Sequence, residues 1–374
     1  MSDPLEILLL GDLILDVPEP DHWMAGIAPL TRAADLVIGH LEVPHTVRGQ
    51  ELAGDVPAPG ADPAHLAALA RANVGIVSMA GNHIADCGAE GIADTEAELD
   101  RLGIAHNGAG ADLAAARVPA RRIVGDRRVS LLSYNCVGPE IAWASATRAG
   151  SAYVNVRAAD GGPCRPQADL VEADPASVAA MCADIAAERD RADLLVVALH
   201  KGITHRPAVL APYERPLSYA AIDAGADVVV GHHAHIARGV EFYRGRPIFH
   251  GLGNGVVVTH ALSPGQGHAA RAEWVERRKR LFGFEPDPAY PLAPFHPEAV
   301  NGLIGKLLYH PDGTMEAGYV PIWFEPPGRP VIAQGGQKDA VVAYLRGITA
   351  AAGLPPLYTV DRGDWIGFAA PADL

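Results

Sequence analysis

The chain has 374 residues, of which 49% are hydrophobic and 20% charged, a composition typical of soluble globular proteins. No stretch of the sequence approaches the ~20 uninterrupted apolar residues that a membrane-spanning helix needs. The 44 acidic and 30 basic residues give a formal net charge of −14, which disfavours binding to nucleic acid or to an anionic membrane surface. We therefore expect neither nucleic acid nor a membrane among the partners.

The amino terminus and the cysteines favour a cytoplasmic location. The first residues lack a basic stretch and a small-residue cleavage site, so we predict no signal peptide. The few cysteines form no CxxC pair, and we expect reduced thiols rather than disulfides. They are Cys87, Cys136, Cys164 and Cys182.

Strands and helices alternate over the first 236 residues. Short apolar runs predict strands at 7–10, 36–39, 74–79, near 104, and at 129–134, 193–199 and 228–230. Helical spacing predicts helices at 23–34, 63–72, 91–102, 175–191 and 216–224. Runs of Val, Ile and Leu between helices are typical of α/β sheets that are covered on both faces.

The pattern changes after residue 236. Strands with tight connections are predicted at 241–243, 247–249, 256–259, 304–309 and 319–324, followed by a helix at 339–351 and a strand at 365–368. We expect a core carrying the functional site at 1–260, an insertion at 261–300, and closing strands and a helix of the same domain at 301–374. The insertion is rich in Pro, Gly and charge, which favours a solvated excursion over a lid-like segment.

Polar residues follow five of the predicted strands, at the point where each of these strands ends. They are Asp12, Glu42, Asn82, His83, His200, His233 and His235. Each alone fits a plain turn, a helix cap or a satisfied histidine. The carboxyl ends of strands in an α/β sheet meet in one crevice, so together they indicate a site. Mixed nitrogen and oxygen ligands suit Mn²⁺, Fe²⁺ or Zn²⁺, and H-x-H on an extended segment would place both rings on one face.

These motifs, in this order, resemble the CapA family of poly-γ-glutamate capsule-synthesis proteins, whose fold is similar to the calcineurin-like metallophosphoesterases. The motifs are Gly11-Asp12, Gly39-His40-Leu41-Glu42, Gly81-Asn82-His83 with Asp86, Leu199-His200, the Gly231–His235 run and Leu252-Gly253-Asn254. The resemblance implies a four-layer αββα sandwich that binds one or two divalent metal ions. It also implies a set of metal ligands, namely Asp12, Glu42, Asn82, His200, His233 and His235. By the same resemblance, His83 is the general acid and Asp86 holds its imidazole.

The sequence departs from the family pattern at several positions. Where the metallophosphoesterases have D-x-H, this chain has Asp12 and Ile14, so one ligand is missing. His40, Asp16 or a water could replace it. Substrate identity is expected to depend on residues near the fourth and last motifs, namely Lys201, His205, Arg206 and Asn254.

Three functions are consistent with these observations. We expect a CapA-like hydrolase that uses metal-activated water on an amide-like or γ-glutamyl bond of a small, anionic substrate. The same site would also serve a metal-dependent phosphoesterase. The third alternative is a non-catalytic protein that binds the polymer during capsule assembly. The expected partner is a small-molecule substrate, and the sequence leaves a homo-oligomer open.

Overall fold

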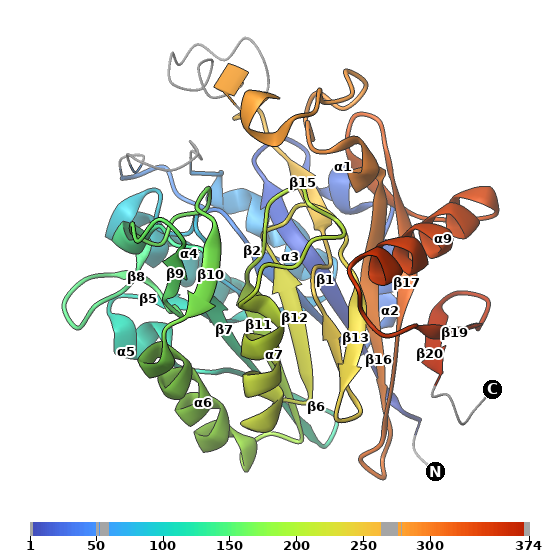
Figure 1. The fold of residues 1–374 in the computed structure, drawn as a ribbon, viewed down its shortest axis with the longest axis horizontal. Coiled ribbons are helices and arrows are strands. Elements are labelled where there is room, and N and C mark those ends of the chain that lie inside the picture. The colour runs from blue at the N-terminus through green and yellow to red at the C-terminus, as the bar shows by residue number, and fades with distance from the viewer. Residues whose placement is uncertain (1–2, 50–51, 53–59, 263–275, 278, 370–374) are drawn as a thin grey trace.

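We describe a computed structural model of the chain, covering all residues except 1–2, 50–51, 53–59, 263–275, 278 and 370–374. Two β-sheets form its centre (Figure 1). The larger has ten strands: β1 (Leu5–Leu15), β2 (Leu36–Leu41), β3 (Val74–Ser78), β4 (Ala105–Asn107), β15 (Asn254–Val258), β16 (Asn301–Tyr309), β17 (Met315–Glu325), β18 (Arg329–Ile332), β19 (Tyr358–Asp361) and β20 (Ile366–Ala369). The smaller has six: β6 (Ala120–Val124), β7 (Arg127–Asn135), β11 (Leu194–His200), β12 (Val228–His232), β13 (Val240–Tyr243) and β14 (Arg246–Phe249).

Helices and short strand pairs complete the fold. The helices are α1 (Pro20–Met24), α2 (Ala28–Ala33), α3 (Leu66–Arg71), α4 (Gly88–Leu102), α5 (Leu113–Ala116), α6 (Pro175–Arg189), α7 (Glu214–Asp223) and α9 (Gly336–Ala351), with single 3₁₀ turns at Pro63–His65, Glu140–Ala142 and Pro297–Val300. The short pairs join β5 (Ala109–Gly110) to β8 (Gly150–Ser151) and β9 (Val156–Ala158) to β10 (Leu170–Ala173). None of the helices in the described part of the chain has the length and apolarity that crossing a bilayer requires.

The layering follows from side chains that alternate along strands. In β1, Ile7 and Leu9 join the core between the two sheets, whereas Leu8 and Leu10 pack on the outer face with α3 and α4. In β11, Val196 faces the inner core, and its neighbours pack outward against α6 and α7. Because both faces of these two strands are buried, both are rich in apolar residues along their whole length. The four-layer αββα arrangement is thereby confirmed.

Two predicted elements differ from the structure. The helix expected at 23–34 is two helices, because the chain turns at Gly26, where a Cβ would lie 2.2 Å from the Pro330 carbonyl oxygen. The first strand does not end at residue 10 but continues to Leu15. Its pairing with β2 shifts register between Leu9 and Asp12, which places Asp12 inside the strand.

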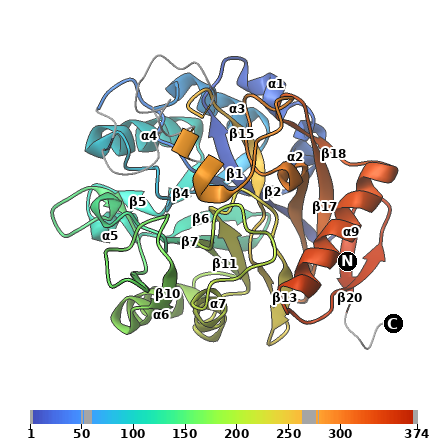
Figure 2. The same ribbon diagram turned by 45° about the horizontal axis from the view of Figure 1, so that its top comes forward.

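The carboxyl-terminal strands complete the larger sheet. β16 pairs antiparallel with β1, and β17 pairs with β16, while α9 adds Leu345 and Ile348 to the core between the sheets. Of the insertion expected at 261–300, residues 263–275 and 278 lie outside the described residues. Figure 2 shows its described orange part crossing the end of the sandwich near β1 and β15.

Candidate metal centre

The parallel strands bring the predicted ligands to one end of the sandwich. Asp12 lies in β1, His40 in β2, and Glu42 directly after β2, while His200 is the last residue of β11. The two sheets meet here, because His232 Nε2 at the end of β12 lies 3.3 Å from the Leu10 carbonyl oxygen of β1. The most deeply buried members of the set are at most 3% exposed, namely Asp12, His40, Glu42, Asn82, His200 and His233.

One group of potential ligands consists of Asp12, Glu42 and His235. Each offers an atom within 4.8 Å of the others. His235 Nδ1 lies 3.3 Å from Asp12 Oδ2, and its Nε2 lies 3.2 Å from Glu42 Oε1. Two carboxylates and one imidazole around a single point form a donor set that suits a borderline divalent cation.

A second group consists of Asp12, His40 and His200, also within 4.8 Å of one another. Asp12 therefore belongs to both groups. Ser78 lies opposite His40 in the β2–β3 register, and its Oγ is 3.1 Å from His40 Nδ1, which leaves His40 Nε2 directed at the site. Gly81 keeps this space open, since a Cβ there would lie 2.9 Å from His40 Nε2.

Neither of the other sequence positions considered for the missing ligand reaches the groups. Ile14 packs in an apolar cluster with Ile236 and Phe295. Asp16 Oδ2 accepts a hydrogen bond from the Thr259 hydroxyl at 2.7 Å. Among these candidates, His40 alone lies within a potential ligand group of the described residues.

The remaining histidine ligands are oriented by neighbouring side chains. His200 Nε2 lies 2.7 Å from Asn82 Oδ1, and His233 Nε2 lies 3.1 Å from Thr204 Oγ1. The Nδ1 atoms of both rings are thus left for another partner. Sequence reasoning missed the orienting residues Ser78 and Thr204, because their partners are set by strand register and by a loop fold.

The backbone after β12 departs from the extended conformation expected for His233 and His235. Their φ angles are 89° and 51°, in the left-handed region. The rings are therefore not aligned by strand alternation, and His233 faces Thr204 while His235 faces Glu42. Such a conformation costs on the order of 1–3 kcal/mol for a residue other than glycine and concentrates at functional sites.

Several potential metal-ligating atoms at this centre are buried and have no hydrogen-bond partner among the described residues. Among the described residues, no hydrogen-bond partner is found for His40 Nε2, Glu42 Oε2, His200 Nδ1 and His233 Nδ1. An unsatisfied buried polar atom costs on the order of 1–3 kcal/mol unless a ligand pairs with it. These atoms are imidazole nitrogens and carboxylate oxygens, so the residues present fit a divalent metal ion.

The protonation states of three of the histidines agree with this fit. Burial lowers the pKa of His233 to about 3 and holds the pKa values of His40 and His200 well below the usual range, so these rings are neutral and able to bind a cation. Burial alone would also lower the pKa of His235, but Glu42 and Asp12 raise it to about 9. Burial, and then the charge of Glu42, raise the pKa of Asp12. Without a bound cation, the His235 imidazolium thus pairs with the ionised Glu42, while the ionised form of Asp12 is disfavoured.

The predicted catalytic pair lies at the edge of this centre. His83 Nδ1 is 2.7 Å from Asp86 Oδ2, and its side chain is 10% exposed. The pair is local, since the two residues are three positions apart in the turn between β3 and α4. This geometry matches a carboxylate that fixes the orientation and the tautomer of a general-acid imidazole.

Of the four residues expected to contact the substrate, the structure turns two away from an open site. Lys201 does not face the site: it is fully buried, and its Nζ pairs with Glu214 at 2.9 Å. Asn254 is also turned inward, with its Oδ1 3.0 Å from His235 Nδ1. Among the expected contacts, Arg206 is exposed, and the His205 ring lies 6.2 Å from that of His235.

Lys201 belongs to a buried network that the sequence did not reveal. His250 Nδ1 lies 3.0 Å from Lys201 Nζ, and Arg238 donates to the same Glu214 oxygen at 3.0 Å. His250 Nε2 continues to Glu241 at 2.9 Å. The partners are distant in sequence and follow no motif spacing, so only the fold brings them together.

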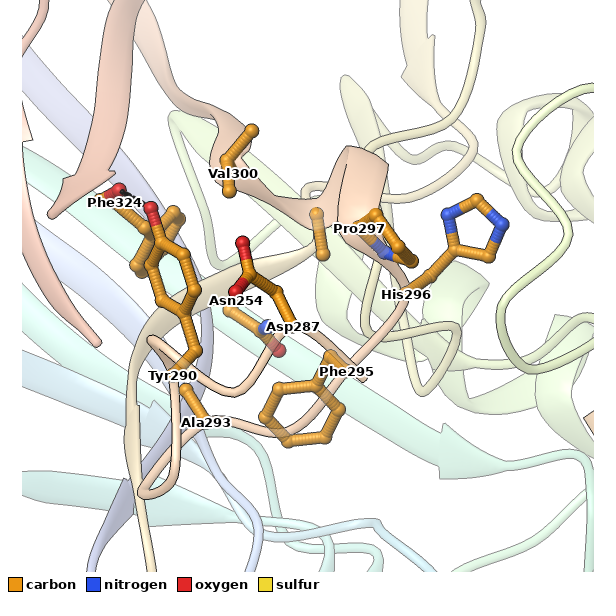
Figure 3. A pocket seen from close by; sticks show the side chains of 10 residues that line it. Asn254, Asp287, Tyr290, Ala293, Phe295, His296, Pro297, Val300 and Phe324 are labelled. Carbon is orange, nitrogen blue, oxygen red and sulfur yellow. Dashed lines mark hydrogen bonds between the residues drawn. The ribbon is translucent and has the colours of Figure 1, made fainter. Parts of the chain in front are cut away.

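Aromatic side chains of the insertion cover one side of the centre. Phe295 stacks on His235 with ring centroids 4.8 Å apart, and Phe282 and Phe284 contact the edge of His205 at 4.7 and 5.1 Å. Figure 3 shows a small cavity next to Phe295, with Asn254 and Asp287 in its lining. These rings exclude water from this side of the candidate ligands.

The fold and the site define an αββα protein with a candidate divalent-metal centre, and comparison with known sequences gives its family. The model of the bacterial capsule synthesis protein family PGA_cap matches residues 6–258, and the chain belongs to this family. A Mycobacterium tuberculosis protein named a probable polyglutamine synthesis accessory protein is 32% identical over 62% of this chain and 58% of its own length. The PGA biosynthesis protein CapA of Bacillus subtilis is 28% identical over 66% of this chain and 60% of its own length.

The chain therefore spans about three fifths of the length of these relatives. Two solved structures align with this chain at low identity. A hypothetical protein from Thermus thermophilus is 18% identical, covers 86% of this chain and all of its own, and has a TM-score of 0.48. The calcineurin-like phosphoesterase YfkN of Bacillus subtilis is 11% identical over 94% of this chain and 99% of its own, with a TM-score of 0.40.

Proposed function

We propose that the protein is a metal-dependent hydrolase that cleaves an amide-like or γ-glutamyl bond in a small, anionic substrate. The observation that carries the proposal is the set of buried, unsatisfied donor atoms beside the His83–Asp86 pair. Asp12, Glu42 and His235 would hold one ion, and Asp12, His40 and His200 a second. Bound Mn, Fe or Zn supplies Lewis acidity and makes water a better nucleophile near neutral pH.

The chain's own residues supply the proton chemistry. Asp86 accepts a hydrogen bond from His83 Nδ1 and thereby fixes the orientation of the His83 imidazole. His83 Nε2 then donates its proton to the leaving nitrogen as the amide bond breaks. The same group would protonate the oxygen of a phosphoester, so this pair alone does not select the bond.

Support for the γ-glutamyl bond comes from the relatives and from charge. Their names refer to polyglutamine and PGA synthesis. Arg206 offers an exposed cation on the loop that contains Thr204. We propose that the substrate is a small soluble molecule and that the reaction takes place in the cytoplasm. The protein acts as a monomer or as a homo-oligomer.

Turnover assays on the metal-loaded protein test the proposal. We expect hydrolysis of γ-glutamyl-p-nitroanilide, and His83→Asn should lower kcat by about 10²–10⁴ with metal content unchanged. His106→Asn, which changes a histidine outside the centre, is the matched control. Turnover of p-nitrophenyl phosphate alone, lost in the His83 variant, would replace the proposal with a phosphoesterase. Binding of poly-γ-glutamate without turnover or metal would replace it with a polymer-binding protein.

A further inference from the structure

A cavity of about 140 Å³ lies on the His233 side of the metal centre. Residues of the loop after β11, including Thr204 and Arg206, form one wall, and Leu281 and Phe282 form another. Thr204 connects the cavity to the centre, because it lines the cavity and its Oγ1 also lies 3.1 Å from His233 Nε2. A group bound here would therefore sit one side chain away from a candidate metal ligand.

The charge of this cavity is unusual for so acidic a protein. Its lining, as far as the structure describes the chain, includes Arg206 and no acidic residue, although acidic residues outnumber basic ones by 44 to 30 overall. Arg206 also makes no ion pair with any residue that the structure describes. By contrast, Arg165 on the adjoining segment pairs with Asp160 at 2.6 Å. A guanidinium without a carboxylate partner, at the edge of a mostly apolar cavity, favours an anionic ligand.

The rest of the lining indicates the shape of that ligand. Ile203, Leu281 and Phe282 provide apolar surface, and Gln167 adds an amide. A short aliphatic stem can pack on the apolar wall while a terminal carboxylate pairs with the planar guanidinium. A phosphate dianion would gain little from the apolar wall and, among the described lining residues, would meet one cation, Arg206.

The cavity in Figure 3 does not have these properties. Its volume is about 20 Å³, enough for about one water molecule, and its lining contains the carboxylate of Asp287. It lies on the Asn254 side of the centre and cannot accept a substrate group. The two cavities therefore differ in both size and charge.

We infer that the cavity at Arg206 is the subsite for a carboxylate on a short aliphatic arm of the substrate, with Arg206 as its specificity-determining cation. This inference rests on the proposed function, since it assumes that the scissile bond lies at the metal centre. It assigns the substrate's negative charge to Arg206 and not to Lys201, which is buried in its own ion pair.

Binding of matched probes to the full-length, zinc-loaded protein tests the inference. Glutaramate has an amide at one end and a carboxylate at the other, whereas glutaramide has amides at both ends. By calorimetry we expect glutaramate to bind about tenfold more tightly than glutaramide, as one charge-assisted pair allows. Arg206→Gln should abolish this preference, and Arg165→Gln, which removes a nearby paired arginine, should preserve it.

The outcomes separate this inference from the proposed function. If Arg206→Gln retains the full preference, the carboxylate binds elsewhere and the inference is wrong. If inorganic phosphate binds more tightly than glutaramate in an Arg206-dependent manner, the subsite is for phosphate and the inference is equally wrong. If the preference depends on Arg206 but no amide is ever hydrolysed, the subsite stands and the hydrolase proposal fails. Filling the cavity with Ala168→Leu should weaken glutaramate binding without changing metal content.

Discussion

Two buried polar clusters lie side by side in this protein, and they differ in whether their atoms have partners. In the network around Lys201, the charged ends of Lys201, Glu214 and Glu241 are all paired within 3.0 Å. In the metal centre, which begins one residue earlier at His200, ring nitrogens and a carboxylate oxygen are left unsatisfied among the described residues. Both clusters are buried and both contain carboxylates and imidazoles, but only the first contains Lys and Arg side chains that pair with its carboxylates. What distinguishes the structural network is that its carboxylates, Glu214 and Glu241, and its imidazole, His250, have partners, whereas several carboxylate and imidazole atoms of the metal centre have none among the described residues.

The largest effect is expected where the paired cluster is broken. Glu214→Gln leaves Lys201 and Arg238 buried without their shared carboxylate. Burial alone would raise the pKa of Glu214, but Arg238 and Lys201 lower it to about 2, so the native state holds it ionised. We expect the free energy of unfolding to fall by about 3–5 kcal/mol, because an uncompensated buried charge remains. Urea denaturation measures this loss.

Measuring stability with and without metal distinguishes Glu214→Gln from a change in the metal centre. The loss in Glu214→Gln should be the same with chelator and with saturating metal. A loss seen only in the metal-bound protein would mean that the network belongs to the metal centre, and the distinction between the clusters would fail.

The second-largest effect on stability is expected at Asp12, which belongs to both groups of potential metal ligands. In chelator, Asp12→Asn should not destabilise the protein, because burial and Glu42 already disfavour the ionised carboxyl and raise its pKa. In metal, the wild type should gain about 2.7 kcal/mol at 100 times the dissociation constant, and the variant should lose this gain. Thermal unfolding with and without Zn²⁺ provides the measurement. Equal metal stabilisation of the two proteins would remove Asp12 from the ligand set.

How much of this arrangement the sequence predicts depends on how far apart in the sequence the interacting residues lie. The αββα fold and the convergence of polar residues at one end follow from local patterns, because each polar residue directly follows or ends an apolar run. The burial of Lys201 does not, since its partner His250 is 49 positions away. The left-handed backbone of His233 is also invisible in the sequence, because tertiary contacts impose it on a residue that ordinarily avoids it.

A smaller effect is expected at His40, which we propose as the replacement for the missing family ligand. His40→Asn removes the nitrogen that faces Asp12 and His200 but leaves the group of Asp12, Glu42 and His235 intact. We expect metal content to fall from about two ions per chain to about one by elemental analysis. His45→Gln changes another fully buried histidine, which lies outside both groups, and should not alter the count. Two retained ions in His40→Asn would show that another group completes the site.

The last effect is expected only as a pH dependence, at a carboxyl that is partly buried and has no ligand to gain. Glu96 on α4 has no cationic partner within the described part of the chain, and burial, with a contribution from Asp100, raises its pKa from 4.5 to about 7. The native state then binds more protons than the unfolded state between these values, so stability falls as the pH rises from about 4.5 to about 7. Glu96→Gln should therefore be more stable than the wild type at pH 8, and the difference should vanish below pH 4.5.

Two residues along the same helix, Glu98 provides the opposite case. Arg101 lowers its pKa through a hydrogen bond, so its ionised form is favoured in the native state. Glu98→Gln should reduce stability at pH 8, and that loss should disappear as the pH falls through the carboxyl's range. Thermal unfolding of both variants across pH measures the two signs. If both glutamines acted in the same direction, the presence of a cationic partner would not decide what a partly buried carboxyl contributes, and the rule drawn from the two buried clusters would not extend to the rest of the protein.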